Sequence, residues 1–253
     1  MLNNTELYYF SPTGGTKRAG EIFCEGISRN VKTINLGAKD RTTQQPDSDL
    51  IVIAVPVFGG RIPTIAAERL KELEGNGKKA VTLAVYGNRA YEDALLELNH
   101  VAEDRDFRVV ASAALVARHS IVPEVGKGRP DEQDRTEILA FAQKILAKLN
   151  SSEETPVQVP GNYPYKKGMH MPATPLSLSS CSQCGACTSV CPTGAIQLEN
   201  GIVETNAEDC ILCMACTAAC PEHARILPPP LQEKTEQMLR ALKSVRGKNE
   251  YFI

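Results

Sequence analysis

The sequence has 253 residues, of which 42% are hydrophobic and 23% are charged, and its formal net charge is −2. These values describe a globular chain with room for one ordinary domain and a smaller one, and they exclude a disordered chain. Nucleic acid is not expected as a partner, because binding it requires a concentrated basic surface. The longest apolar run, residues 50–58, has nine residues, too few to span a bilayer. Residues 1–6 do not resemble a signal peptide, so we expect a cytoplasmic protein.

Short apolar runs alternate with amphipathic stretches from residue 6 to residue 150, as in βαβ units around a parallel sheet. The uninterrupted apolar run at residues 50–55 indicates a central strand that is covered on both faces. We predict an α/β fold with a doubly wound, five-stranded parallel sheet in the order 2-1-3-4-5. The predicted strands are residues 7–10, 32–36, 50–55, 80–85 and 109–117, and the predicted helices are residues 16–29, 64–74, 91–104 and 130–150.

A segment rich in glycine and hydroxyl groups follows the first predicted strand and leads into a helix. Its candidate ligand-binding residues are Ser11, Thr13, Gly14, Gly15 and Thr16. Hydroxyls and free backbone N–H groups at a helix N-terminus can form a receptor for a phosphate. The spacing fits neither the G-x-x-x-x-G-K-[ST] loop of nucleoside triphosphate sites nor the G-x-G-x-x-G fingerprint of dinucleotide sites. Taken alone, the segment could also be an ordinary turn.

Two further loops follow the third and fourth predicted strands, at residues 56–63 and 86–91. Ligands of open α/β sheets bind at the carboxyl ends of the strands, where all three loops meet. The first loop resembles the FMN-phosphate loop of flavodoxins, and this resemblance implies that the other two hold the isoalloxazine ring. Phe58 and Tyr91 are then the candidates for stacking on the ring, although either aromatic alone could be an edge packing residue. The remaining candidate residues of these loops are Gly59, Gly60, Arg61, Gly87, Asn88 and Arg89.

Five prolines between residues 151 and 180 exclude a continuous helix and indicate an extended connection. We therefore expect four parts: a flavodoxin-like FMN-binding domain (1–150), a Pro-rich linker (151–175), a cysteine-rich domain (176–230) and a C-terminal helix (231–253). In the linker, Lys166, Lys167 and His170 could contact the acidic cysteine-rich domain.

Eight of the nine cysteines lie between residues 181 and 220. They form two Cys-x-x-Cys-x-x-Cys-x-x-x-Cys-Pro runs that are 29 residues apart, which indicates an internal duplication. In such runs three thiolates bind one [4Fe–4S] cluster, and the fourth binds the other cluster. One cluster is expected on Cys181, Cys184, Cys187 and Cys220, and the other on Cys210, Cys213, Cys216 and Cys191.

Structural zinc is the alternative for paired Cys-x-x-Cys units, but zinc has no use for a Cys-Pro pair at the same place in each run. Between the runs, Asn200-Gly201 predicts a β-hairpin turn. The ninth cysteine, Cys24, lies alone in the first predicted helix and is expected to be a packing residue.

The cysteine-rich segment resembles the bacterial two-cluster ferredoxins, and the whole chain resembles flavodoxin–ferredoxin fusion proteins of anaerobic bacteria. The resemblance implies FMN and two [4Fe–4S] clusters as cofactors, with ferredoxin-linked oxidoreductases as redox partners. The expected function is electron transfer between the clusters and FMN, linking low-potential one-electron carriers to a flavin. The alternative is an enzyme, a flavin-dependent reductase of a small molecule that is fed by the clusters.

Two residues bear on the choice between carrier and enzyme, and two more bear on how easily the flavin is reduced. A pocket over the flavin lined by His119 and Arg129 would favour the enzyme, whereas a flat charged surface would favour the carrier. We expect His119 to be an ordinary loop histidine. Arg61 and Arg89 stand where ordinary flavodoxins tend to be acidic, which predicts that the flavin is more easily reduced here.

Overall fold

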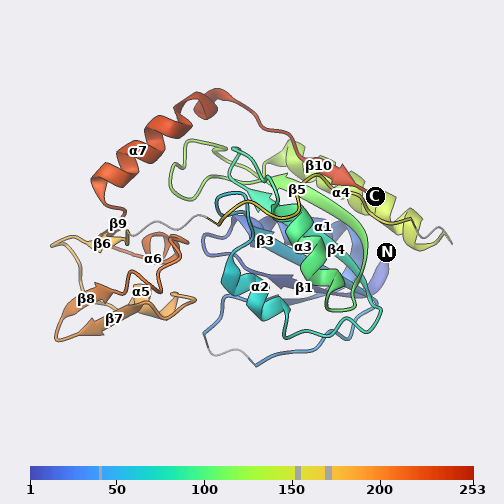
Figure 1. Cartoon of the computed structure of the whole chain (residues 1–253), viewed down its shortest axis with the longest axis horizontal. Helices are drawn as coiled ribbons and strands as arrows, with labels where there is room; N and C mark the ends of the chain where they lie inside the picture. Colours follow the sequence, from blue (N-terminus) through green and yellow to red (C-terminus); the bar gives the residue numbers. More distant parts are fainter. Residues whose placement is uncertain (40–41, 152–154, 169–172) are drawn as a thin grey trace.

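The larger domain is built on a mostly parallel sheet (Figure 1). The computed structural model describes residues 1–39, 42–151, 155–168 and 173–253, so His170 lies outside the described residues. Within them, the sheet has six strands in the order β10-β5-β4-β3-β1-β2. This confirms the predicted order 2-1-3-4-5 and the doubly wound fold class. The parallel strands are β1 (Leu2–Tyr9), β2 (Ser28–Asn35), β3 (Leu50–Pro56), β4 (Lys79–Tyr86) and β5 (Arg108–Val116).

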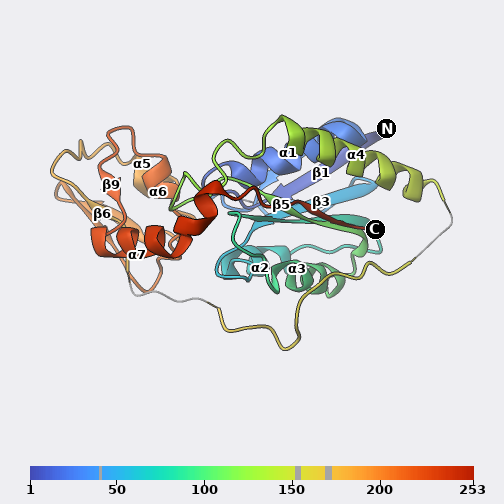
Figure 2. The ribbon, with the colours of Figure 1, turned by 90° about the horizontal axis from the view of Figure 1, so that it is seen from above.

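Helices cover both faces of this sheet (Figure 2). One face carries α1 (Gly15–Ile27) and α4 (Glu132–Leu149), and the other carries α2 (Thr64–Leu70) and α3 (Ala94–Glu103). The side chains of β3 are buried from residue 50 to residue 55, as its uninterrupted apolar sequence predicts. Two apolar layers result, one on each face of the sheet. They hold the strands in place, and the predicted ligand loops emerge at the carboxyl ends of these strands.

The smaller domain contains two short antiparallel pairs and two one-turn helices. The predicted turn at Asn200-Gly201 joins β7 to β8, and both residues have positive φ, 51° and 78°. The small helices lie in the two cysteine runs, at corresponding places 29 residues apart. The elements of this domain are β6 (Leu176–Ser177), α5 (Ala186–Ser189), β7 (Ile196–Glu199), β8 (Ile202–Thr205), α6 (Ala215–Ala218) and β9 (Arg225–Ile226).

The C-terminal segment differs from the predicted single helix. Helix α7 (Pro229–Leu239) continues as a 3₁₀-helix, η1 (Arg240–Ser244), and the chain then returns to the larger domain. There β10 (Glu250–Phe252) pairs antiparallel with β5, opposite Ser112–Ala114. The prediction of a helix to residue 253 was wrong here, because tertiary pairing with an open sheet edge decides this short segment. The five predicted parallel strands are present, and β10 adds an antiparallel strand at their edge.

Several contacts join the two domains at the carboxyl edge of the sheet. Lys39 Nζ donates to the Thr188 carbonyl at 2.9 Å, and an Arg69 guanidinium nitrogen donates to the Pro192 carbonyl at 3.0 Å. Leu239 of α7 packs against Val122 and Val125, in the loop that follows β5. The smaller domain therefore lies against the edge at which ligands bind in sheets of this type.

The connection between the domains runs along the side of the sheet that carries α2 and α3 (Figure 2). Residues 155–168 contain no helix or strand. Both carboxylate oxygens of Asp93 hold this segment, because they accept hydrogen bonds from the backbone N–H groups of Asn162 and Lys166, at 2.9 and 2.7 Å. These bonds hold the segment against the start of α3, and the Lys166 carbonyl accepts a further bond from Arg61, in the loop that follows β3.

Candidate functional site

The loop after β1 leaves open backbone donors at the start of α1. Ser11 Oγ accepts the Lys17 N–H at 2.9 Å, which closes the loop from within. Gly14 precedes the helix with φ 88°, a left-handed conformation that suits glycine, and a Cβ there would meet no atom within 4 Å. Among the described residues, no hydrogen-bond acceptor serves the N–H groups of Gly15 and Thr16. The loop thus presents donors to open space, as a phosphate receptor requires.

A cavity of about 650 Å³, here called the phosphate-loop cavity, lies over this loop. Thr13, Gly14 and Gly15 line it, whereas the Thr16 side chain is buried in the first turn of α1. Arg18 and Arg118 contribute two cationic side chains to its wall. The smaller domain closes the other side with Thr217, Ala218 and His223.

A second cavity of about 510 Å³, here called the ring-loop cavity, lies beside the loop after β3. Phe58, Gly59 and Arg61, three of the residues predicted to hold the ring, line one side of it. Residues 210–212 of the smaller domain line the opposite side. His119 and Ser120 line both cavities, so the two cavities adjoin. Their volumes lie within the ~300–1,000 Å³ range of small-molecule sites.

The loop after β4 contributes less than the sequence predicts. Asn88 is buried, and its side chain donates to the Val245 carbonyl at 2.8 Å and accepts the Gly247 N–H at 2.7 Å. The Tyr91 hydroxyl donates to Glu250 at 2.8 Å. Neither residue lines the cavities, because both hold the C-terminal segment, whose return to the sheet the sequence does not indicate. The predicted contacts of these two side chains with a flavin ring are therefore not supported.

Glycines of these loops serve close packing. A Cβ on Gly87 would lie 2.5 Å from a ring carbon of His119, so only glycine lets the histidine lie against this loop. Gly60 is buried, and its carbonyl accepts the Asp93 N–H at 3.1 Å.

The two arginines of the ring loops are ion-paired. Arg61 makes two hydrogen bonds to Glu97, at 2.7 and 2.6 Å, and a third to the Lys166 carbonyl at 2.6 Å. Arg89 is exposed and lies 3.1 Å from Glu92. A paired cation has a weaker effect on a nearby flavin than a free one. The expectation that these arginines make the flavin easier to reduce is therefore weakened.

His119 lies at the junction of the two cavities and is more specifically placed than the sequence suggests. Its Nδ1 accepts the N–H groups of Ile121 and Val122, at 3.2 and 3.1 Å. Burial, assisted by the Arg89 charge, lowers the pKa of His119 to about 4. The ring is therefore neutral at physiological pH, with its proton on Nε2.

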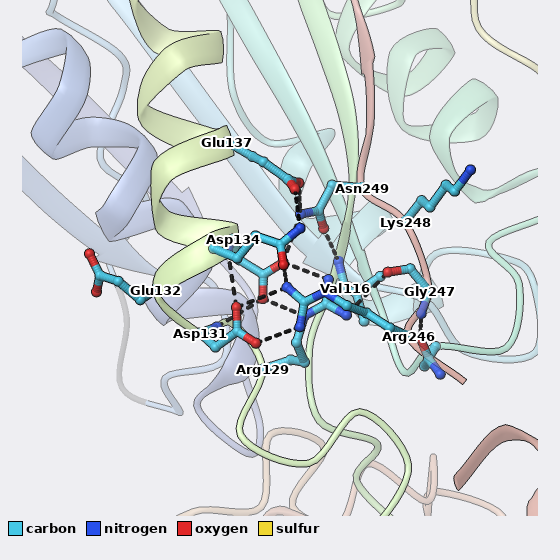
Figure 3. Close-up of polar contacts among 12 residues, drawn as sticks. Val116, Arg129, Asp131, Glu132, Asp134, Glu137, Arg246, Gly247, Lys248 and Asn249 are labelled. Carbon is cyan, nitrogen blue, oxygen red and sulfur yellow. Dashed lines mark hydrogen bonds and ion pairs between the residues drawn. The ribbon is translucent and has the colours of Figure 1, made fainter. Parts of the chain in front are cut away.

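Arg129, the other residue expected in an enzyme pocket, lines the phosphate-loop cavity together with His119, but its guanidinium is already paired (Figure 3). Its guanidinium makes two hydrogen bonds to the buried carboxylate of Asp134 and one, at 3.1 Å, to the Gly247 carbonyl. It therefore holds the C-terminal segment and is not free to bind a substrate.

The eight cysteines of the smaller domain fall into two neighbourhoods. Cys191, Cys210, Cys213 and Cys216 line one small apolar cavity, although Cys191 is far from the others in sequence. Burial and the charges of its three neighbours raise the pKa of Cys213 to about 12, partly offset by the Ala215 N–H. In the other set, Cys181 lies close enough to Cys187 to raise its pKa, an effect secondary to burial.

In the described part of the chain, no three His, Cys, Asp or Glu side chains are grouped as for a single metal ion. A [4Fe–4S] cluster spreads its thiolates over four irons and does not need such a group. A separate observation fits a charged cluster. The guanidinium of Arg225 is buried among these cysteines, and its Nε has no hydrogen-bond partner.

A family model described as a 4Fe-4S dicluster domain matches residues 168–225. Among proteins with curated functions, none matches this sequence. The chain is similar to a solved flavodoxin from Streptococcus pneumonia, at 18% identity over 57% of this chain and 99% of that one, with a TM-score of 0.43. It is similar to Flavodoxin 1 from Bacillus cereus at 15% identity over 57% of this chain and 98% of that one, with a TM-score of 0.44. It is also similar to rubredoxin oxygen:oxidoreductase from Desulfovibrio gigas at 18% identity over 59% of this chain and 37% of that one, with a TM-score of 0.44.

The fold class rests on the strand order, which is that of the flavodoxin-like sheet. The chain therefore joins a flavodoxin-like domain to a ferredoxin-type 4Fe–4S dicluster domain. The cofactors that this fusion implies are FMN and 4Fe–4S clusters. Among the helices of the described residues, none combines the length and the apolar character needed to cross a membrane.

Proposed function

We propose that this chain transfers electrons between two [4Fe–4S] clusters and a bound FMN. One observation carries the proposal: the ring-loop cavity has Phe58 and Arg61 on one side and Cys210 on the other. A predicted cluster ligand thus belongs to the wall of the predicted flavin site. Close approach of redox groups is the main requirement for electron transfer between them, and the shared cavity at the interface of the two domains supports such an approach.

The phosphate-loop cavity suits the phosphate of FMN. The N–H groups of Gly15 and Thr16 point to a shared receptor, and the guanidinium groups of Arg18 and Arg118 line the same cavity. Backbone donors at a helix N-terminus and arginines both favour a doubly charged anion. The adjoining ring-loop cavity then accepts the isoalloxazine ring, so that a single ligand spans both. When bound, FMN takes up one or two electrons, whereas each cluster exchanges one.

The cluster ligands are proposed as two crossed sets. The proximal set, beside the ring-loop cavity, is Cys191, Cys210, Cys213 and Cys216. The distal set is Cys181, Cys184, Cys187 and Cys220. The support for crossing is that Cys191 lines the same small cavity as the three cysteines of the second run. Electrons from a partner protein would enter at the distal set, where Cys184 is exposed.

His119 has a positioning role in this proposal. Its neutral ring presents an Nε2–H donor at the junction of the two cavities, and Nδ1 is held by two backbone N–H groups. A fixed donor there orients a polar group of the ligand without adding charge. The same placement favours the second candidate function, a flavin-dependent reductase, because a small-molecule substrate would meet this donor. Arg129 does not add to that case, because its guanidinium is already paired.

The experiment compares Cys191→Ala with Cys184→Ala in anaerobically purified protein. Flavin, iron and acid-labile sulfide are measured first, and two cubanes require about eight irons and eight sulfides per chain. A one-electron photoreductant is then added, and flavin absorbance is followed with time. We expect Cys191→Ala to lose the proximal cluster and to slow flavin reduction far more than Cys184→Ala does, since the latter keeps the proximal cluster.

Two results would contradict the proposal. Protein that binds neither FMN nor any other flavin removes the electron acceptor. Loss of the same cluster in both variants, seen by electron paramagnetic resonance, contradicts the crossed ligand sets. Rapid consumption of a small-molecule acceptor by the reduced protein would favour the reductase.

A further inference from the structure

The dicluster domain contains a buried cation that its cysteine motifs do not require. Arg225 in β9 is 3% exposed. Its guanidinium donates to Ser177 Oγ at 3.0 Å and to Thr205 Oγ1 at 2.8 Å, and both acceptors are neutral hydroxyls. The third donor, Nε, is buried without a partner. In the part of the chain that the structure describes, no carboxylate forms an ion pair with this side chain. A buried charge without a counter-charge is strongly unfavourable, so a counter-charge is to be expected nearby.

The internal duplication shows that packing alone does not explain this arginine. With the 29-residue offset, Arg225 corresponds to Ile196, the first residue of β7. Ile196 is 5% exposed, so both positions are interior. The same place in the fold thus accepts a purely apolar side chain in one repeat. In the other repeat, Arg225 places a positive charge at this position. Ile196 is therefore the position at which an uncharged substitution can serve as a control.

Arg225 is next to both predicted cluster sites. Thr205, whose Oγ1 accepts a hydrogen bond from Arg225, lines the small cavity together with the four cysteines of the proximal set. Arg225 itself lines a separate cavity with Cys181 of the distal set. The cation therefore lies between the two sites, and Thr205 ties it to the one whose four predicted ligands share a cavity.

We infer that Arg225 is the internal counter-ion of the two clusters and raises their reduction potentials, that of the proximal cluster most. Reduction adds one electron to a cluster that already carries negative charge, and a fixed buried cation stabilises the more negative form. The electron comes from an external one-electron donor, which is oxidised. A higher proximal potential draws electrons from the distal cluster towards the ring-loop cavity. The inference rests on the iron–sulfur half of the proposed function and does not depend on the flavin.

The test is an anaerobic redox titration monitored by electron paramagnetic resonance, on wild type, Arg225→Lys, Arg225→Gln and Arg225→Met. Iron content is measured for each variant, to show that both clusters are present. We expect both neutral variants to lower the equilibrium constant for reduction of the proximal cluster at least tenfold, which is about 59 mV for one electron. The distal cluster should shift less, and Arg225→Lys should keep most of the wild-type value. Ile196→Met, the matched control in the other repeat, should change neither potential.

Arg225→Gln guards against a folding defect, because glutamine retains hydrogen-bonding groups for Ser177 and Thr205. Unchanged potentials in a neutral variant with full iron content would overturn the inference. So would an equal shift in Arg225→Lys, since the effect would then follow packing and not charge. If the protein proved to bind no flavin, the proposed electron path would fail while these cluster potentials would still be measurable.

Discussion

Replacing Asn249 with alanine should weaken the attachment of the C-terminal segment to the larger domain. The Asn249 amide donates to Asp134 and to Glu137, each at 2.8 Å, and accepts the Val116 N–H at 2.9 Å (Figure 3). Two of these three bonds go to carboxylates, one of which, that of Asp134, is fully buried. The substitution would leave the Val116 N–H and part of the Asp134 carboxylate without their partner.

The expected magnitude follows from these three bonds. A hydrogen bond to a charged group contributes about 1.5–3 kcal/mol to stability, and a neutral one about 0.5–1.5 kcal/mol. The simple sum overestimates the effect, because the bonds share one side chain and Asn249 is only half-buried, so water can replace part of them. We therefore expect Asn249→Ala to lower the free energy of unfolding by about 3 kcal/mol.

Lys248→Ala is the matched control. Its side chain is exposed, and its carbonyl accepts the Tyr86 hydroxyl at 2.9 Å in a way that alanine preserves. Urea unfolding followed by far-ultraviolet circular dichroism, with equal cofactor loading, gives the free energy for each variant. The reasoning is refuted if Asn249→Ala and Lys248→Ala agree within about 0.5 kcal/mol, the usual range for surface substitutions.

Two further predictions concern the cavities. The folded protein holds the pKa of His119 at about 4, below its ordinary value, so on acidification the unfolded chain binds this proton before the folded protein does. The free energy of unfolding should therefore be highest above about pH 6.5 and should fall as the pH decreases towards 4. His119→Asn should remove on the order of 3 kcal/mol of that pH dependence, and an unchanged slope of unfolding free energy against pH would contradict the burial argument. Thr13→Ala should weaken FMN binding by about 1–2 kcal/mol in a fluorescence titration, whereas Thr136→Ala, on the outer face of α4, should not. Equal affinities for the two variants would place the phosphate elsewhere.

The central architecture could be predicted because local sequence decides it. Residues 50–55 are apolar without interruption, and the structure buries them as the middle strand. The cysteine runs likewise specify a cluster domain, since metal ligation dictates their spacing. Asn200-Gly201 specifies its hairpin because few other residue pairs adopt two positive φ angles. In each case the physical constraint acts within a few residues of the signal.

What the sequence did not indicate depends on contacts between distant segments. The last residues form β10 only because the outer edge of β5 is available, and a short strand has no strong local signal. Asn88 and Tyr91 also differ from their predicted roles at the flavin ring, because their hydrogen-bond partners are in this returning segment. The sequence does contain an indication of Arg225, because an arginine stands there at the position where the other repeat has the isoleucine Ile196.

The course of the chain has a consequence for how the cluster domain can move. The polypeptide leaves the larger domain after α4, forms the dicluster domain, and then re-enters the same sheet as β10. The cluster domain is therefore an insertion that is tethered at both ends, not an appendage on one linker. Two tethers keep the effective concentration of the proximal cysteines at the cavity high, even when the contacts between the domains open. A single break in the connecting segment 155–168 would leave the two fragments joined by non-covalent contacts alone, among them the pairing of β10 with β5.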